Sequence, residues 1–176
     1  MATATPLPIS VSEYLHTSYQ PDCDYVDGVI KERNFGELDH AELQRAFILY
    51  LLPHERDWKI RTLPEIRVRT SATRVRIADV AIISVTAPRE QVILTPPLAV
   101  IEILSPEDRT PRYAERLDDY RGMGVKSIWV VDPATRKGFD CSAGEWIEAT
   151  HFAVPNSPIR IDLAAIFAAI DQDRAR

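Results

Sequence analysis

The stretch LAVIEILSPED, residues 98–108, places one charged side chain inside an apolar run that stops at a Ser-Pro pair. Alternate side chains of a β-strand share a face, so Glu102 would lie beside Leu98, Val100 and Leu104. Because both faces are otherwise apolar, the pattern is typical of a strand in the middle of a sheet. A buried carboxylate is costly unless it meets a cation, a metal ion or several hydrogen-bond donors, which makes Glu102 a candidate site residue.

A second carboxylate interrupts the preceding apolar segment. Asp79 lies in RIADVAIIS, residues 76–84, between Ala78 and Val80. Two acids on neighbouring strands suit a hard divalent ion such as Mg²⁺, which takes oxygen ligands and commonly keeps waters beside one or two carboxylates. Ion pairing is the alternative, in which each acid meets an arginine of the region 61–76 or caps a neighbouring loop. Spacing alone leaves both interpretations open.

The segments around these acids predict the order helix, strand, strand, strand, helix, strand, which is that of an α/β sandwich with a mixed sheet. The first helix is expected over 40–52, with Asp39 as its N-cap and Glu42 at the capping-box position. The second is expected to begin at Pro111 after a Thr110 cap. The four strands are expected over 64–70, 74–85, 96–105 and 125–132.

Shorter elements are predicted on both sides of this core. A capping box precedes a short helix over 11–16, and the pair Asp27-Gly28 predicts an N-terminal hairpin. A C-terminal hairpin is expected around Ala143-Gly144, followed by a helix that Asp162 caps. Because no long linker interrupts these elements, the chain is interpreted as one domain over residues 1–176.

Composition narrows the class of protein. The 176 residues are 45% hydrophobic and 27% charged, as in ordinary globular proteins, and the net charge of −5 excludes a strongly basic, non-specific nucleic-acid binder. Two cysteines, Cys23 and Cys141, stand in no metal-binding spacing and favour a reducing compartment. The start MATATPLPIS lacks a signal-peptide pattern, and no apolar run has the ~20 residues of a membrane span. A cytoplasmic protein without a membrane partner is therefore expected.

The order of the motifs resembles that of the PD-(D/E)XK nuclease superfamily, and the wider pattern is similar to the Uma-type restriction endonuclease family of bacteria. The motifs are YVDGVI, DHAELQRAF, PEIRVRT, ADVAIIS, VIEILSPEDRT, ERLDDYRGMGVKSIWVVDP and the final hairpin, which together span almost the whole chain. The resemblance implies a restriction-endonuclease-like α/β fold, in which a mixed β-sheet is flanked by helices, with an N-terminal hairpin and a C-terminal hairpin plus helix. It also implies a metal-dependent endonuclease that hydrolyses nucleic-acid phosphodiester bonds, with DNA as the expected partner.

The resemblance further implies a set of site residues. Asp79, Glu102 and the backbone carbonyl of Ile103 would hold Mg²⁺ or Mn²⁺, which would activate water and neutralise charge on the scissile phosphodiester. Glu65, in PEIRVRT, falls where a further acid often lies in the family, and His40 opens the first helix as another candidate. Each of these two has a plainer interpretation, Glu65 as an edge-strand acid and His40 as a surface residue of the first helical turn.

One position departs from the superfamily pattern. A lysine normally stands two residues after the glutamate, whereas this chain has Leu104 there. The Uma-type family takes its lysine from the following helix, and the position that resembles it in AERLDDY is Arg116. Arginine cannot act as a general base near neutral pH, yet its planar fork can hold a phosphate or stabilise an anionic transition state. A surface ion pair with Asp119 is the alternative for Arg116.

Three functions stay open on the sequence. The first is the endonuclease, and the second is a catalytically impaired nuclease-fold protein that binds nucleic acid or a protein partner, which Leu104 and Arg116 favour. The third is a structural assembly protein, with a homodimer as the expected form. A cluster of arginines near Asp79 would line a phosphate groove in the first two cases, or blunt an edge strand as solvated residues. Its members are Arg61, Arg67, Arg69, Arg74 and Arg76.

Overall fold

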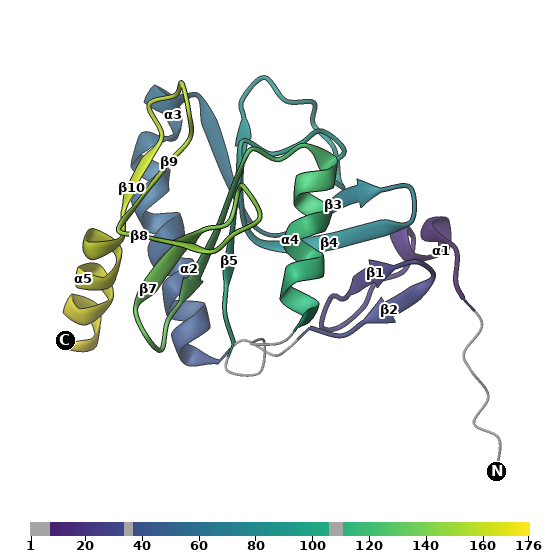
Figure 1. Ribbon diagram of the computed structural model, residues 1–176, viewed down its shortest axis with the longest axis horizontal. Helices are drawn as coiled ribbons and strands as arrows, with labels where there is room; N and C mark the ends of the chain where they lie inside the picture. The colour runs from purple at the N-terminus through teal and green to yellow at the C-terminus, as the bar shows by residue number, and fades with distance from the viewer. Residues whose placement is uncertain (1–7, 34–36, 106–110) are drawn as a thin grey trace, which may run out of the picture.

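Eight strands form one mixed sheet in the computed structural model of the chain, which describes residues 8–33, 37–105 and 111–176 (Figure 1). The strands are β1 Asp24–Val26, β2 Val29–Lys31, β3 Ile60–Ser71, β4 Arg74–Ser84, β5 Ala99–Ile103, β6 Ser127–Asp132, β7 Lys137–Asp140 and β8 Ile147–Ala149. Their order is β2-β1-β4-β5-β6-β7-β8, and β3 pairs with β4 off this path. The pair of β5 with β6 is parallel, and the other neighbours are antiparallel.

Helices cover both faces of this sheet (Figure 1). One face packs against α2 and α5, and the other packs against α4. A second sheet of two strands, β9 and β10, joins the core on the α2 side. The elements beyond the large sheet are α1 Val11–Leu15, α2 Leu38–Leu51, the 3₁₀ turn η1 Leu52–His54, α3 Glu55–Trp58, α4 Pro111–Met123, β9 His151–Ala153, β10 Arg160–Asp162 and α5 Leu163–Arg174. The predicted mixed sheet flanked by helices is confirmed.

Side-chain alternation along the central strands builds two separate cores. Ile101 of β5 packs with Phe47 on the α2 side, whereas Val100 packs with Leu117 and Tyr120 on the α4 side. All five residues of β5 are buried, as the apolar run around Glu102 predicts. The carboxylate of Glu102 therefore has to find its partners inside the protein.

Two strands share one edge of β4. β1 pairs with its start, where Val26 lies opposite Arg74, and β5 pairs with its second half, where Val80 lies opposite Ile101. Residues 76–79 pair with neither strand, while β3 follows the opposite edge of β4. β1 and β5 thus diverge at this point. On this edge of β4, the backbone groups of residues 76–79 have side chains as hydrogen-bond partners in place of a neighbouring strand.

The alternation along β3 and β4 changes at Glu65 and Asp79. Ala78 and Ala81 are three residues apart, yet both pack into the core on the α4 side, which a regular period of two does not allow. Glu65 has a positive φ of 47°, a conformation that is uncommon for a residue with a side chain. The irregularity directs Asp79 towards the start of α2, where its side chain meets His40.

Several predicted boundaries are confirmed. The N-terminal and C-terminal hairpins form as β1–β2 and β7–β8, and Asp27 and Gly28 both have the positive φ that their turn requires. Ser10 caps α1 by accepting a hydrogen bond from the backbone N–H of Glu13 at 3.1 Å. Asp162 caps α5 in the same way, through the N–H of Ala164 at 2.9 Å.

The prediction of Asp39 as an N-cap is wrong. α2 begins two residues before the expected start at position 40, at Leu38, and Glu37 holds the N-cap position without a side-chain hydrogen bond. Asp39 lies inside the first turn and pairs with Arg174 at the end of α5, so a long-range ion pair replaces the local cap. The predicted cap Thr110 lies outside the described residues.

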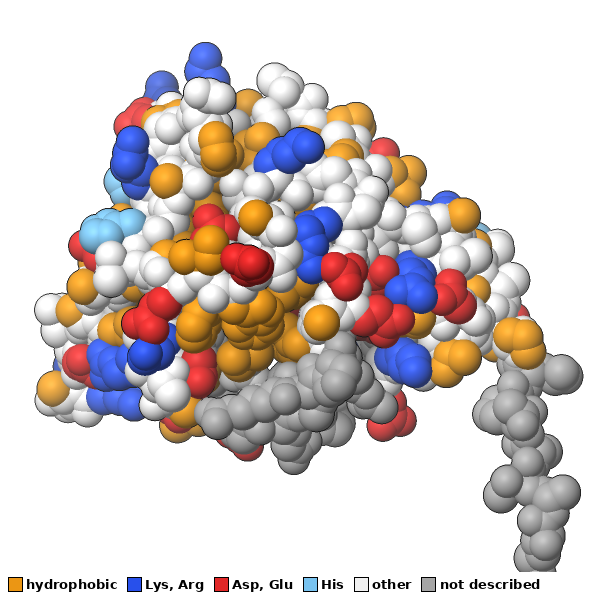
Figure 2. Space-filling view, in the orientation of Figure 1, with side chains coloured by type: hydrophobic (Ala, Val, Ile, Leu, Met, Phe, Trp, Pro, Cys, Tyr) orange, Lys and Arg blue, Asp and Glu red, His pale blue; other side chains and the backbone are white. Residues whose placement is uncertain are grey.

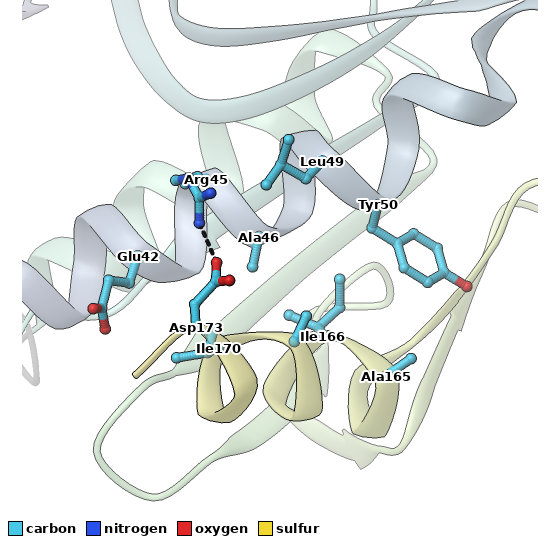
Figure 3. A pocket seen from close by; sticks show the side chains of 10 residues that line it. Glu42, Arg45, Ala46, Leu49, Tyr50, Ala165, Ile166, Ile170 and Asp173 are labelled. Atoms are coloured by element: carbon cyan, nitrogen blue, oxygen red, sulfur yellow. Dashed lines mark hydrogen bonds and ion pairs between the residues drawn. The ribbon is translucent and has the colours of Figure 1, made fainter. Parts of the chain in front are cut away.

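α5 packs along α2, and the two helices enclose a groove of about 200 Å³ (Figure 3). Ile166 and Ile170 belong to the same buried core as Ala46 of α2. At the edge of the groove, Arg45 donates a hydrogen bond to Asp173 at 2.6 Å. Apolar packing and this ion pair together hold α5 against α2.

Charges of both signs are interspersed on the face that carries α4 (Figure 2). One mixed group lies between α4 and β1, where Arg74 pairs with Asp27, Glu115 and Asp119. In the described part of the chain, no helix is both long enough and apolar enough to cross a membrane.

Two glycines test the packing of the fold. A Cβ on Gly138 of β7 would lie 2.2 Å from Leu163 Cδ1 and 2.9 Å from Phe152 Cζ, whereas a Cβ on Gly122 of α4 would meet no atom within 4 Å. We expect Gly138→Ala to lower the free energy of unfolding by about 1–3 kcal/mol through overpacking. Gly122→Ala, the matched control, should leave it unchanged or raise it, because alanine favours helix. Urea denaturation measures both, and equal stabilities of the two variants would contradict the packing described.

Candidate active site

Asp79 is 1% exposed and lies where β1 and β5 diverge from β4. Its Oδ2 accepts a hydrogen bond from the backbone N–H of Ile103 at 2.7 Å, which ties it to β5. His40 Nε2 lies 3.3 Å from the same oxygen, and Arg33 donates to Oδ1. Strand, helix and the segment after β2 therefore all meet at this carboxylate.

Glu102 is fully buried on the neighbouring strand. The hydroxyl of Tyr120 donates to its Oε1 at 2.7 Å, and Arg116 Nη1 donates to its Oε2 at 2.8 Å. Both partners come from α4, one turn apart, so this helix supplies the compensating donors for the strand that it covers. Tyr120 and Arg116 thus meet Glu102 from α4, whereas the side chains that meet Asp79 come from α2 and from the segment after β2.

Glu65 joins the site from β3 through Arg33 and Gln44. Arg33 Nη1 lies 2.5 Å from Glu65 Oε2 while its Nη2 contacts Asp79, so one guanidinium bridges two carboxylates. Gln44 Nε2 donates to Glu65 Oε1 at 3.0 Å and to the backbone carbonyl of Asp79 at 2.8 Å. The side chain of Glu65 is 49% exposed, so this side of the site reaches solvent.

Arg116 is held from the N-terminal hairpin as well. Its Nη2 donates to Asp24 Oδ2 at 2.8 Å, and Asp24 is 2% exposed. Asp24 also accepts from the backbone N–H of Ile77 at 3.0 Å and from Arg76 Nη1 at 3.1 Å. It therefore occupies the backbone edge that β1 and β5 leave unpaired, and it fixes Arg116 opposite Glu102.

The residue that stands where the superfamily pattern has a lysine, Leu104, is part of the core. Leu104 is 8% exposed and packs with Tyr113 and Leu117 of α4. Arg116 reaches Glu102 from that helix, in line with its predicted placement, and its side chain is only 14% exposed. Asp119, the alternative partner of Arg116, pairs instead with other arginines, Arg74 and Arg76.

The two buried carboxyl groups differ in their acidity. Burial alone would raise the pKa of Asp79, but the hydrogen bond from His40 and the charge of Arg33 outweigh it and hold the pKa well below its usual range. Burial raises the pKa of Glu102, and the nearby negative charge of Asp79 adds to this effect, although Arg116 opposes it. Asp79 is consequently the more firmly ionised of the two.

His40 responds to the same carboxylate. Burial disfavours its protonated form, yet the hydrogen bond to Asp79 and the charge of that group prevail and raise the pKa of the imidazole. A protonated His40 donates from Nε2 to Asp79 Oδ2 and so fixes the orientation of the carboxylate. Its side chain is 12% exposed, so it is not the surface residue of the plainer interpretation.

The two carboxylates suit a hard divalent ion in chemical type. Within residues 8–33, 37–105 and 111–176, no three His, Cys, Asp or Glu side chains converge as a ready-made metal site. Positive charge nevertheless occupies the position, since Arg33 bridges Asp79 and Glu65 while Arg116 meets Glu102. These guanidinium groups occupy the place that a metal ion would take. The carboxylate oxygens that they contact are therefore of the right type to bind a divalent ion in place of one guanidinium. The carbonyl of Ile103 accepts from the Tyr113 hydroxyl at 3.3 Å.

The arginines of the β3–β4 hairpin do not pair with the two carboxylates. Arg67 pairs with Asp22, and Arg76 pairs with Asp24 and Asp119. Arg61 and Arg69 donate to backbone carbonyls. The ion-pair alternative was therefore right about partners of this chemical type and wrong about the region 61–76 as their source.

The structure places Asp79, Glu65 and His40 in one group of ion pairs and Glu102 with Arg116 in another. The hydrogen bond from the Ile103 backbone N–H to Asp79 joins the strands that carry these groups into one site. Sequence reasoning missed Arg33, Asp24 and Tyr120, which complete it. Asp24 is recognisable in the sequence, because it is a charged residue directly before the apolar pair of a short strand. Asp79 likewise is a charged residue among the apolar residues of β4. Arg33 and Tyr120 stand in ordinary surroundings, and only the fold identifies them.

Similarities to known proteins concern the family and the fold. Residues 11–156 match the Uma2 family model, described as "Putative restriction endonuclease". Among solved structures, a "putative nuclease belonging to DUF820 from Anabaena variabilis ATCC 29413" is similar with a TM-score of 0.77 and 19% identity, over 93% of this chain and 99% of that chain. A chain of the "DrdV-DNA complex" has a TM-score of 0.41 and 15% identity, over 73% of this chain and 11% of that one. No curated protein matches the chain. The first of these structures confirms the predicted fold class.

The contact between His40 and Asp79 predicts a coupled titration. We expect the pKa of His40 to lie above its ordinary value in the wild type, and to fall in Asp79→Asn, because burial then acts without the opposing charge. NMR titration of the imidazole signals measures both values. Asp27→Asn, which removes a carboxylate of the β1–β2 turn outside the site, is the matched control and should leave the His40 curve unchanged. An unchanged His40 curve in Asp79→Asn would show that Asp79 is not its partner.

Proposed function

The chain belongs to the Uma2 family of restriction-endonuclease-like proteins, and from this premise we propose that it is a divalent-metal-dependent endonuclease that hydrolyses phosphodiester bonds of DNA. The observation that carries the proposal is the burial of two carboxylates, Asp79 and Glu102, on adjacent strands. The backbone N–H of Ile103 donates to Asp79 at 2.7 Å, which holds the strand of Glu102 against this carboxylate. In a sheet core that is otherwise apolar, such a pair is costly and calls for a function.

Asp79 and Glu102 would hold Mg²⁺ or Mn²⁺, and the carbonyl of Ile103 would join them when the Tyr113 hydroxyl releases it. A divalent ion at this position would supply Lewis-acid stabilisation of the phosphodiester and lower the pKa of a bound water. His40 acts as a positioning residue, because it donates to the same oxygen of Asp79 that Ile103 contacts. Asp79 thus keeps one orientation while its other oxygen faces Arg33.

Glu65 is the further acid of the site. It lies on the solvent side, where its carboxylate is linked to Asp79 by Arg33 and by Gln44. An acid in this place can accept a hydrogen bond from an attacking water as the substrate approaches. We assign it this role because it is the exposed acid of a site whose other acids, Asp24, Asp79 and Glu102, are buried.

Arg116 takes the place of the family's lysine. A guanidinium does not release a proton near neutral pH, so its contribution is to stabilise negative charge. Asp24 and Glu102 hold it on two sides, each at 2.8 Å, and the site therefore presents a fixed positive group beside the second carboxylate. Fixed charge of this kind needs little reorganisation when an anionic transition state forms.

A second candidate function rests on the same substitution. With Leu104 in the core and Arg116 ion-paired, the site has no lysine, which favours a catalytically impaired nuclease fold that binds nucleic acid or a protein partner without cleaving it. Tight binding of DNA with no cleavage in Mg²⁺ or Mn²⁺ would support this candidate. We expect a homodimer under either candidate function, and sedimentation velocity of the purified protein measures the oligomeric state.

Cleavage of supercoiled plasmid tests the proposed endonuclease. We expect cleavage in Mg²⁺ or Mn²⁺, its loss on chelation with EDTA, and a decrease of about a hundredfold or more in Asp79→Ala and in Glu102→Ala, because each removes a metal ligand. Asp27→Ala is the matched control. It removes a half-exposed aspartate of the β1–β2 turn, outside the site, and should cleave as the wild type does.

Two results bear directly on the assignment. Cleavage that persists in both carboxylate variants would remove Asp79 and Glu102 from the mechanism. Arg116→Lys restores the family's residue type, so a large gain in rate would identify the wild type as an impaired nuclease, whereas a loss would show that this chain uses the guanidinium itself.

A further inference from the structure

Arg33 is the most unusual component of the site. It follows β2, its side chain is 14% exposed, and its two terminal nitrogens contact carboxylates from different strands, Glu65 of β3 and Asp79 of β4. The charge of Asp79, with smaller contributions from Glu65 and Glu102, outweighs burial and raises the pKa of Arg33 further. Arg33 is thus a permanent cation between Glu65 and Asp79, the second of which is a proposed metal ligand.

A divalent ion and this guanidinium carry charge of the same sign and would bind the same oxygen of Asp79. Oδ2 already accepts from Ile103 and faces His40, so Oδ1, which Arg33 contacts, is the oxygen that remains for an ion. Two cations on one buried carboxylate oxygen repel each other, so metal binding at Asp79 favours the withdrawal of Arg33. Glu65 is half exposed, so the guanidinium has a route towards solvent along its second partner.

We propose that Arg33 competes with the divalent ion for Asp79, and that a DNA phosphate relieves this competition by accepting the displaced guanidinium. The inference rests on the proposed function, because it assumes that Asp79 is a metal ligand. It adds a property that metal ligation alone does not imply, namely that metal loading depends on the substrate.

The physical basis of this coupling is that Arg33 exchanges one negatively charged partner, Asp79, for another, a phosphate. Without DNA, an ion that enters must displace a buried cation whose new surroundings offer weaker partners. A phosphate at the mouth of the site offers the planar, bidentate geometry that a guanidinium prefers, so the displaced group regains a strong contact. Binding of metal and of DNA then reinforce each other, and the coupling is reciprocal by thermodynamic necessity.

Titration with MnCl₂, followed by the electron paramagnetic resonance signal of unbound Mn²⁺, tests the competition without relying on cleavage. Arg33→Met keeps much of the side-chain volume and removes the charge, and we expect it to bind Mn²⁺ about tenfold more tightly than the wild type when DNA is absent. Arg33→Lys keeps the charge but lacks the fork that bridges two acids, and its affinity should fall between the two.

A short DNA duplex with cleavage-resistant phosphorothioate linkages tests the coupling. We expect it to raise the Mn²⁺ affinity of the wild type by about tenfold, within the usual range of coupling between sites, and that of Arg33→Met by a clearly smaller factor. Arg121→Met is the matched control. It removes an arginine whose side chain is 23% exposed and paired with Asp118 on α4, away from the site, and it should behave as the wild type. Circular dichroism confirms that each variant is folded.

The outcomes separate this inference from the proposed function. If Asp79→Asn abolishes Mn²⁺ binding while Arg33→Met binds no more tightly than the wild type, the metal site stands and the competition is wrong. Equal enhancement by DNA in the wild type and Arg33→Met would overturn the coupling in the same way. If the wild type, Arg33→Met and Arg33→Lys all bind no Mn²⁺, the proposed metal site fails and the inference fails with it.

Discussion

Two carboxylates buried in an apolar sheet require compensating charge, and the arrangement around the centre of this molecule follows from that requirement. Asp79 contacts Arg33 of the segment after β2 and His40 of α2. Glu102 accepts hydrogen bonds from Arg116 and Tyr120 of α4. Breaking a buried ion pair on one side leaves an uncompensated charge, at a cost of about 3–5 kcal/mol. The elements on both faces of the sheet are therefore held in register by the same interactions that define the candidate site.

Asp24 extends this constraint to the N-terminal hairpin. Because β1 and β5 diverge along one edge of β4, a backbone N–H at Ile77 lacks a strand partner, and the Asp24 carboxylate accepts from it. The same carboxylate meets Arg76 and Arg116, so the position of the hairpin and that of the helix arginine depend on each other. The hairpin therefore helps to position the residues of the site, although its strands lie at one end of the sheet.

Local patterns in the sequence predicted the elements of the core and the two carboxylates, because apolar periodicity and charge inside it are visible without the fold. Resemblance alone pointed to Arg116, whose partners lie 14 and 92 residues away along the chain. Arg33 was not predictable, since its two partners are brought together only when β3 pairs with β4, and nothing in its neighbourhood distinguishes it from the other basic residues. The misplaced cap at Asp39 has the same origin, because its partner Arg174 is 135 residues away.

The sequence positions of these partners give the two halves of the site different times of completion during synthesis. Arg33 and His40 precede Asp79, so its neutralising groups already exist when β4 emerges. Arg116 and Tyr120 follow Glu102 by 14 and 18 residues, so these two partners do not exist until α4 has been made. A nascent chain that ends before α4 consequently lacks both of these donors for the acid in its central strand, and Glu102 can gain them only when α4 packs onto the sheet.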